Sequence, residues 1–175
     1  MENQKDAIKK IAFNYGIIWG LLSIVLSVIA YVTDNHIERP MWLTIAGLAI
    51  MAGIIVYGLK AFKLENEGYL SVSESLKVGL AISLIAAIIT AIYNYIFITV
   101  IEPEYVIQML EFSTEQMVIQ NPEMTQEQMD MATGITEKMM TPTIMTAMGI
   151  IVPLFLGFIT SLVCGLILKV NRPEN

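Results

Sequence analysis

The sequence predicts an all-α integral membrane protein, an antiparallel four-helix bundle with a helical hairpin outside the membrane between spans three and four. Composition is the first observation behind this fold, with 55% hydrophobic and only 15% charged residues in a chain of 175. The mean hydropathy of +0.65 is the second. Thirdly, the charges cluster between long uncharged runs, whereas helices on the surface of a soluble domain carry a charged face throughout. We therefore treat residues 1–175 as a single membrane domain.

The four predicted spans cover residues 11–33, 40–62, 74–101 and 143–168. Each contains an uncharged run of about 20 residues, which as an α-helix reaches across roughly 30 Å of hydrocarbon. A Lys or Asp at the centre of such a helix would cost about 2.5–3.5 kcal/mol, and none occurs there. The pattern favours insertion of all four segments into a bilayer.

Local signals agree with the edges of these spans. Pro40 suits the first turn of a helix, because its missing N–H is not needed there. Ser71 and Glu74 have the spacing of a capping box, which predicts that the third helix starts before the membrane. Gly68 is a candidate C-terminal cap for the second helix.

Residues 102–141 form the one sizeable segment outside the predicted spans, and it is acidic. Apolar residues at helical spacing predict a helix over 104–120, which the Asn121–Pro122 pair should end. Thr125 and Gln128 have capping-box spacing, so a second helix should follow. The apolar stripe predicted for this second helix consists of Met129, Ala132, Ile135, Met139 and Met140. We expect a helical hairpin whose apolar stripes pack on the bundle, on the membrane interface or on a partner.

Basic residues are divided unevenly between the two sides of the predicted bundle. Those on the side of the chain ends are Lys5, Lys9, Lys10, Lys60, Lys63, Lys77, Lys169 and Arg172. Only Arg39 and Lys138 lie on the opposite side. Because cytoplasmic loops carry the excess of Lys and Arg, both chain ends are expected in the cytoplasm and the hairpin outside.

Several short segments together resemble a known family. They are Gly16–Gly20, Tyr57–Lys60, Gly68–Ser71, Ser75–Gly79, Ile92–Ile96 and Ile101–Tyr105. With them the chain resembles, over most of its length, a Bacteroidota membrane family catalogued as domain-of-unknown-function family 4199. The resemblance implies a multi-pass protein of the bacterial inner membrane and supplies no activity.

Small residues form rows along two of the predicted spans. In span four they recur at four-residue intervals, as Gly149, Pro153, Gly157, Ser161 and Gly165. Span one has a shorter row with Gly16 and Gly20. Such rows let another helix backbone approach closely. We expect packing within this bundle, with docking of a second membrane protein or a second copy as the alternative.

The most polar group inside the spans lies on span three and consists of Ser83, Thr90, Tyr93 and Asn94. A buried Asn side chain needs a hydrogen-bonding partner within the membrane. Hydrogen bonds between helices or anchoring at the interface would satisfy the group. The alternative is a site for a ligand or a lipid headgroup.

Several classes of function lack support in the sequence. No nucleophile elbow, HExxH, phosphate loop or zinc spacing occurs, so no catalytic, cofactor-binding or metal-ligating residue is predicted and the protein is expected not to be an enzyme. The methionines between Met109 and Met148 have no His or Cys beside them outside the spans, which favours apolar packing over copper binding. A net charge of −6 argues against nucleic acid.

The leading functional hypothesis is a non-enzymatic accessory or scaffold subunit of a bacterial inner-membrane complex. Its partners would be the lipid bilayer and either another membrane protein or further copies of the chain. The alternative is a small transporter or lipid-binding membrane protein. Coupled transporters usually carry an ionisable residue inside the membrane, and the spans have none between their edges.

Overall fold

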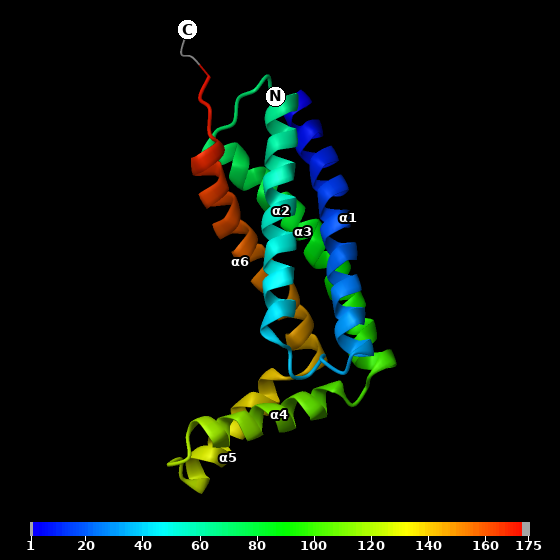
Figure 1. Ribbon diagram of the computed structural model, residues 1–175, viewed down its shortest axis with the longest axis vertical. Helices are drawn as coiled ribbons and strands as arrows, with labels where there is room; N and C mark the ends of the chain where they lie inside the picture. The colour runs from blue at the N-terminus through cyan, green and yellow to red at the C-terminus, as the bar shows by residue number, and fades with distance from the viewer. Residues whose placement is uncertain (1, 173–175) are drawn as a thin grey trace.

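The computed structural model describes residues 2–172, with side chains from Gln4 onward, and this part of the chain is almost entirely helical (Figure 1). Its elements are α1 (Glu2–Val32), α2 (Met41–Glu65), α3 (Val72–Ile96), the π-helix η1 (Phe97–Ile101), α4 (Tyr105–Gln120), α5 (Gln126–Met139) and α6 (Pro142–Leu168).

Within residues 2–172, four segments are long and apolar enough to cross a membrane, which confirms the predicted all-α membrane bundle. They are Gln4–Val32, Met41–Glu65, Val72–Ile101 and Pro142–Leu168. Successive spans run in opposite directions, so the described ends of the chain lie at one end of the bundle and α4 and α5 at the other (Figure 1). We refer to these as the terminal end and the hairpin end.

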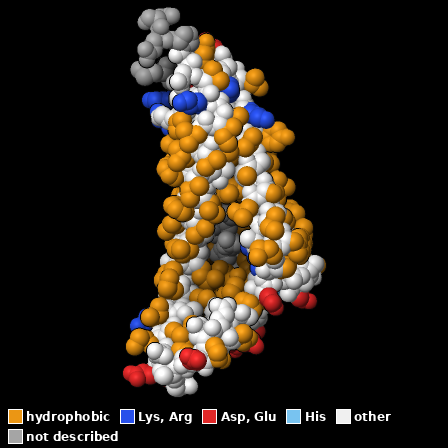
Figure 2. Space-filling view, turned by 60° about the vertical axis from the view of Figure 1, so that its left-hand side comes forward, with side chains coloured by type: hydrophobic (Ala, Val, Ile, Leu, Met, Phe, Trp, Pro, Cys, Tyr) orange, Lys and Arg blue, Asp and Glu red, His pale blue; other side chains and the backbone are white. Residues whose placement is uncertain are grey.

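Charged residues are sorted between the two ends. Lys and Arg side chains gather near the terminal end, Asp and Glu near the hairpin end, and a belt of hydrophobic side chains covers the helices between them (Figure 2). A bilayer would accommodate this belt, because apolar side chains can face lipid directly. The chain is therefore a multi-pass membrane protein.

The helix caps predicted from the sequence form at the expected residues. Ser71 and Glu74 form a complete capping box at the start of α3, and Thr125 and Gln128 form another at the start of α5. At the end of α2, the Gly68 N–H donates to the Lys63 carbonyl at 2.8 Å, five residues back. Gly68 has the expected positive φ of 85°, but the left-handed turn already begins at Glu67, with φ 58°.

Helix α3 is central and makes its most extensive contacts with α6 and α1. The row of small residues on α6 lies against a matching row on α3. A Cβ added to Gly157 would come within 2.8 Å of the Ser83 Cβ, and one added to Gly165 within 2.6 Å of the Ser75 Cβ. Between these two contacts, Ser161 meets Gly79. Glycine and serine thus alternate across the contact, which brings the two backbones together.

The row on α1 also packs against α3. A Cβ added to Gly16 would lie 2.6 Å from the Ile85 Cβ, and one added to Gly20 would lie 2.9 Å from Ile89 Cγ2. Both isoleucines come from α3, on a different side from the serine row. Gly16, Gly20, Gly157, Ser161 and Gly165 therefore serve packing within the chain, whereas Gly149 and Pro153 of the predicted row line a cavity between the spans.

Large buried side chains concentrate in the terminal half of the bundle. Ile55, Leu59 and Phe62 of α2 are fully buried, as are Val78 and Ile82 of α3. Beyond them, Leu70 and Val170 exchange two backbone hydrogen bonds of 3.0 and 2.9 Å, which tie the α2–α3 loop to the segment after α6. The helices are densely packed here, and a cavity of about 350 Å³ lies further toward the terminal end, beside Phe62, Asn66 and Arg172.

The polar residue Asn66 holds the terminal end together. Its side-chain oxygen accepts hydrogen bonds from Gln4 Nε2 and Arg172 Nη2, both at 3.1 Å. Its amide nitrogen donates to the Tyr69 carbonyl at 2.9 Å. Asn66 is only 5% exposed, so these bonds satisfy a polar group that would be costly to bury alone. One side chain thereby links α1, the α2–α3 loop and the segment after α6.

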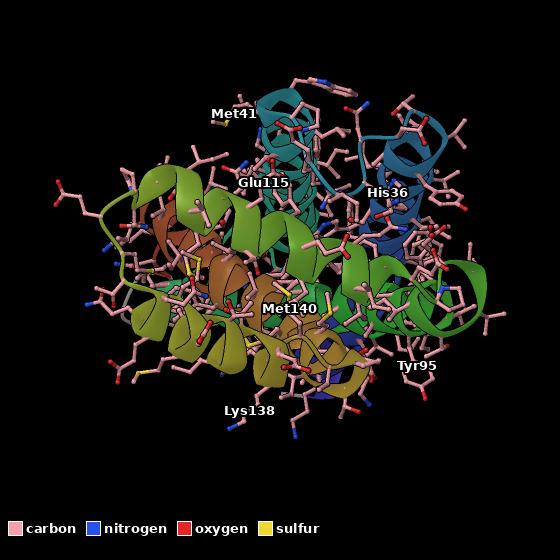
Figure 3. All side chains as sticks on the ribbon, turned by 90° about the horizontal axis from the view of Figure 1, so that it is seen from below. His36, Met41, Tyr95, Glu115, Lys138 and Met140 are labelled. Atoms are coloured by element: carbon pink, nitrogen blue, oxygen red, sulfur yellow. The ribbon has the colours of Figure 1, made fainter. Side chains whose placement is uncertain are left out.

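Helices α4 and α5 form the predicted hairpin, and they lie across the hairpin end of the bundle instead of continuing its axis (Figure 3). No residue of either helix is buried. On α5, Met131, Ile135 and Met139 are 64%, 55% and 56% exposed at four-residue spacing. Of the predicted stripe, Met129, Ala132 and Met140 are half-buried, whereas Ile135 and Met139 are exposed. Met131, which was not predicted to belong to it, lies in line with these two, so the described chain leaves Met131, Ile135 and Met139 uncovered.

Candidate functional site

In the hairpin half of the bundle, a cavity lies between the spans themselves. A cavity of about 460 Å³ lies between α1, α2, α3 and α6, and we call it the deep cavity. Its apolar walls include Trp19, Met51, Ala86 and Leu156. The space-filling view shows the surface hollowed between the helices and the hairpin (Figure 2). A volume of this size is typical of sites for small ligands.

Two glycines help to make this space. Gly47 of α2 lines the deep cavity, and a Cβ added to it would meet no atom within 4 Å. Gly149 of α6 lines it as well, and its added Cβ would make only an ordinary 3.5 Å contact with Asn94 Nδ2. These glycines leave room for a ligand, whereas Gly157 and Gly165 leave room for a helix.

A second cavity of about 170 Å³ adjoins the first toward the hairpin end, and we call it the loop cavity. The two cavities share Ser27, Arg39, Tyr93 and Asn94 in their walls. Residues that line only the loop cavity are Ala30, His36, Phe97, Ile98, Tyr105 and Met145. Together the cavities form one site that is apolar in the bundle and polar toward the α1–α2 loop.

Three of the four residues of the predicted polar group come together in this site. Thr90, Tyr93 and Asn94 line the deep cavity. The Asn94 side chain makes no hydrogen bond to any other described residue, so its amide is available to a ligand. Ser83 lies elsewhere, fully buried against Gly157, and its hydroxyl donates to the Gly79 carbonyl at 2.8 Å.

Aromatic rings build the wall of the loop cavity around Phe97, the first residue of η1. Tyr31 and Tyr105 meet Phe97 edge to face, with centroids 5.2 and 5.6 Å away. Tyr93 stacks on it at 6.0 Å. Such pairs each contribute about 0.5–1.5 kcal/mol beyond the area they bury. The cluster joins α1, α3 and α4 at the point where the bundle meets the hairpin.

His36 belongs to this aromatic wall but differs from it chemically. Its ring meets Tyr31 edge to face at 5.2 Å and stacks on Tyr105 at 6.2 Å. Both ring nitrogens are buried, and neither has a hydrogen-bonding partner among the described residues. An unsatisfied buried polar group costs about 1–3 kcal/mol. The imidazole is therefore prepared to bind a polar group that enters the loop cavity.

Arg39 is the cation of the site. It precedes α2, lines both cavities and is itself exposed. No described carboxylate lies within ion-pair distance of its guanidinium, since the ion pairs found join Lys10 to Glu65 and Arg172 to Glu67. Burial raises the pKa of the Tyr105 phenol, and the nearby charge of Arg39 opposes that rise. A positive charge without a counterion therefore stands at the mouth.

The nearest well-fixed acid is engaged elsewhere. Tyr31 Oη donates to Glu102 Oε2 at 3.0 Å, and Gln108 Nε2 donates to Glu102 Oε1 at 3.1 Å. Glu102 thus connects α1 to α4 across the end of η1. Among residues 2–172, no three His, Cys, Asp or Glu side chains gather as a metal site would require.

The sequence pointed to part of this site and missed the rest. It selected Thr90, Tyr93 and Asn94 because they are polar within an apolar run. It noted Arg39 only as one of two basic residues on the hairpin side, and it did not select His36 as a site residue. One signal could have marked them, because they lie three residues apart in the short loop before Pro40, on the side where Lys138 is the other basic residue.

Comparisons with known proteins identify a family but no activity. The sequence model of a family described as "Protein of unknown function (DUF4199)" matches residues 14–170. No curated protein shows significant similarity to the chain, and neither does any solved structure. The matched segment includes all residues of the site described above.

Proposed function

Because the chain belongs to the DUF4199 family, whose description gives no activity, we propose a function from its cavity: it binds an amphiphilic lipid between its spans, without catalysis. The deep cavity carries this proposal. Its walls in the bundle are apolar and its polar residues lie at the hairpin end, which is the order of tail and head in a lipid. The loop cavity extends the polar part.

The distribution of charge supports a location and an orientation within the proposal. Eight of the ten Lys and Arg residues belong to the terminal-end segments, which the positive-inside rule assigns to the cytoplasm (Figure 2). The protein would then lie in a bacterial inner membrane with both chain ends in the cytoplasm. The polar mouth of the cavity would open at the level of the outer headgroups.

Filling the deep cavity should abolish lipid binding without disturbing the fold. Trp19 is a useful reporter, because it lines the cavity and is only 6% exposed, while Trp42, the other tryptophan, is 54% exposed. In a Trp42→Phe background, vesicles of lipid brominated on the acyl chain should quench Trp19 fluorescence. Gly47→Phe should lower that quenching by at least about twofold, because the ring displaces the chain from the cavity.

Gly53→Phe is the matched control for this experiment. Gly53 lies on the same helix, has no atom within 4 Å of an added Cβ and does not line the cavity. Quenching in this variant should equal that of the background chain. Equal quenching in the Gly47→Phe and Gly53→Phe variants would count against lipid in the cavity. Gly149→Ala offers a second, milder filling variant if Gly47→Phe does not fold.

A second candidate is the accessory or scaffold subunit, and the hairpin favours it. Gly16, Gly20, Gly157 and Gly165 do not support this role, since α3 occupies the space beside them within the chain. The exposed stripe of Met131, Ile135 and Met139 remains without a cover from the described chain. Exposed acidic residues surround it, among them Glu127, Asp130 and Glu137. The partner would therefore be a membrane protein with an apolar contact flanked by basic residues.

The double variant Met131→Ser with Ile135→Ser tests this second role. Neither side chain is buried, so the fold should persist, while a partner purified with the native chain in mild detergent should be lost. Leu64→Ser is the control, since Leu64 is 81% exposed on α2 at the terminal end. Retention of the same partner by all three chains would exclude the stripe as its contact, and a native chain that purifies without any partner would exclude the role.

A further inference from the structure

We infer that the site selects an amphiphile with an anionic head, which Arg39, His36 and Asn94 would hold at the mouth of the cavity. This inference rests on the proposed lipid binding and adds the chemical class of the ligand. The three side chains come from the α1–α2 loop and α3, and all of them line the loop cavity. Each has hydrogen-bonding capacity that the described chain leaves unused.

Charge decides the sign of the preferred head. Among the described residues, Arg39 is the one Lys or Arg in the wall of either cavity, and no Asp or Glu lines them. The acid closest along η1, Glu102, is already hydrogen-bonded to Tyr31 and Gln108. A guanidinium presents five N–H donors in a fork that matches the oxygens of a phosphate or carboxylate. The site therefore favours a negative group over a neutral or positive one.

The remaining donors complete a cradle for such a group. A neutral imidazole carries one N–H donor, and the Asn94 amide nitrogen carries two. An anionic head would give both side chains a hydrogen-bonding partner. The two His36 ring nitrogens are buried and have no such partner in the described chain. The aromatic wall fixes the ring of His36 between Tyr31 and Tyr105, so little freedom is lost on binding. A head placed here would leave its acyl chains pointing into the deep cavity.

The test compares heads that carry the same brominated chains. The Trp42→Phe chain is placed in vesicles of unbrominated phosphatidylcholine, and brominated phosphatidylglycerol or brominated diacylglycerol is added. Phosphatidylglycerol should quench Trp19 at about tenfold lower mole fraction than diacylglycerol, since a charged hydrogen bond in a partly dry site is worth that ratio. Arg39→Gln should reduce the difference between the two lipids to about twofold. His36→Phe should weaken the binding of phosphatidylglycerol about fivefold, while an aromatic ring stays in place at this position.

Lys138→Gln is the control with the same change in charge. Lys138 is the other basic residue of the hairpin end, and its side chain points away from the bundle (Figure 3). It should leave the preference for phosphatidylglycerol intact.

Equal quenching by both lipids, unchanged by Arg39→Gln, would overturn the anionic head while leaving lipid binding in place. No quenching of Trp19 by either lipid beyond the level of the Gly47→Phe variant would instead remove the proposed function itself. If glycerol 3-phosphate at equal concentration displaced phosphatidylglycerol, the ligand would be a soluble anion, and the proposal of a lipid ligand would be overturned.

Discussion

Replacing Gly157 with leucine is expected to destabilise the folded bundle strongly. A Cβ at this position already comes within 2.8 Å of the Ser83 Cβ, and Ser83 is fully buried, so neither side chain can move aside. The leucine would force α6 away from α3 along a contact that Gly79, Ser161 and Gly165 continue. Such overpacking costs about 3 kcal/mol or more, a large part of the total stability of a small protein.

Unfolding by sodium dodecyl sulfate in mixed micelles, followed by circular dichroism, would measure this effect. Gly53→Leu is the matched control, because an added Cβ there meets no atom within 4 Å and the change even favours helix by up to about 1 kcal/mol. Gly157→Leu should therefore lower the free energy of unfolding, whereas Gly53→Leu should raise it slightly. A Gly157→Leu chain that folds normally yet loses a partner would contradict internal packing and return this face to an interaction surface.

Replacing Phe97 with alanine is expected to destabilise the protein by about 3–5 kcal/mol, the usual cost of removing a buried phenyl ring. Phe97 is 8% exposed and supports three tyrosines from three helices. The damage should be local to the hairpin end, since the α3–α6 contact and the residues around Asn66 lie in the other half. Amide hydrogen exchange should accelerate around η1 and the start of α4 while the terminal half stays protected.

Phe155→Ala separates the loss of this cluster from the loss of any phenyl ring. Phe155 belongs to α6 and is 62% exposed on the surface that would face lipid. Its removal should change the free energy of unfolding by less than about 1 kcal/mol. Equal effects of the two substitutions would mean that the aromatic cluster does not hold the hairpin end.

Much of the bundle could be predicted because its signals are local in the sequence. A run of about 20 apolar residues determines a span by itself, and a capping box such as Ser71 with Glu74 determines a helix start within four residues. The row through Gly157 and Gly165 likewise indicates close approach of a helix. It does not indicate which helix approaches, since Ser75 and Ser83 of α3 become its partners only once the chain has folded.

The site could be predicted only in part for the same physical reason. Asn94 is conspicuous because an amide is rare in an apolar run, whereas Arg39 and His36 lie in a short loop where polar residues are ordinary. The deep cavity depends on what is missing at Gly47 and Gly149, which belong to different helices. The arrangement of the helices determines the empty space between them. The spacing of residues within one helix therefore cannot predict a cavity.

The π-helix η1 sets the direction in which the hairpin leaves the bundle. Within it, the Glu102 N–H donates to the Phe97 carbonyl at 2.8 Å, so the hydrogen bond spans five residues where an α-helix spans four. Removing one residue from η1 would restore α-helical pairing and turn the following chain by about 100°. Tyr105 would then leave the aromatic wall and Glu102 would leave Tyr31. One extra residue of chain length within η1 thus sets the direction in which α4 leaves the bundle, without any contribution from side chains on the hairpin's surface.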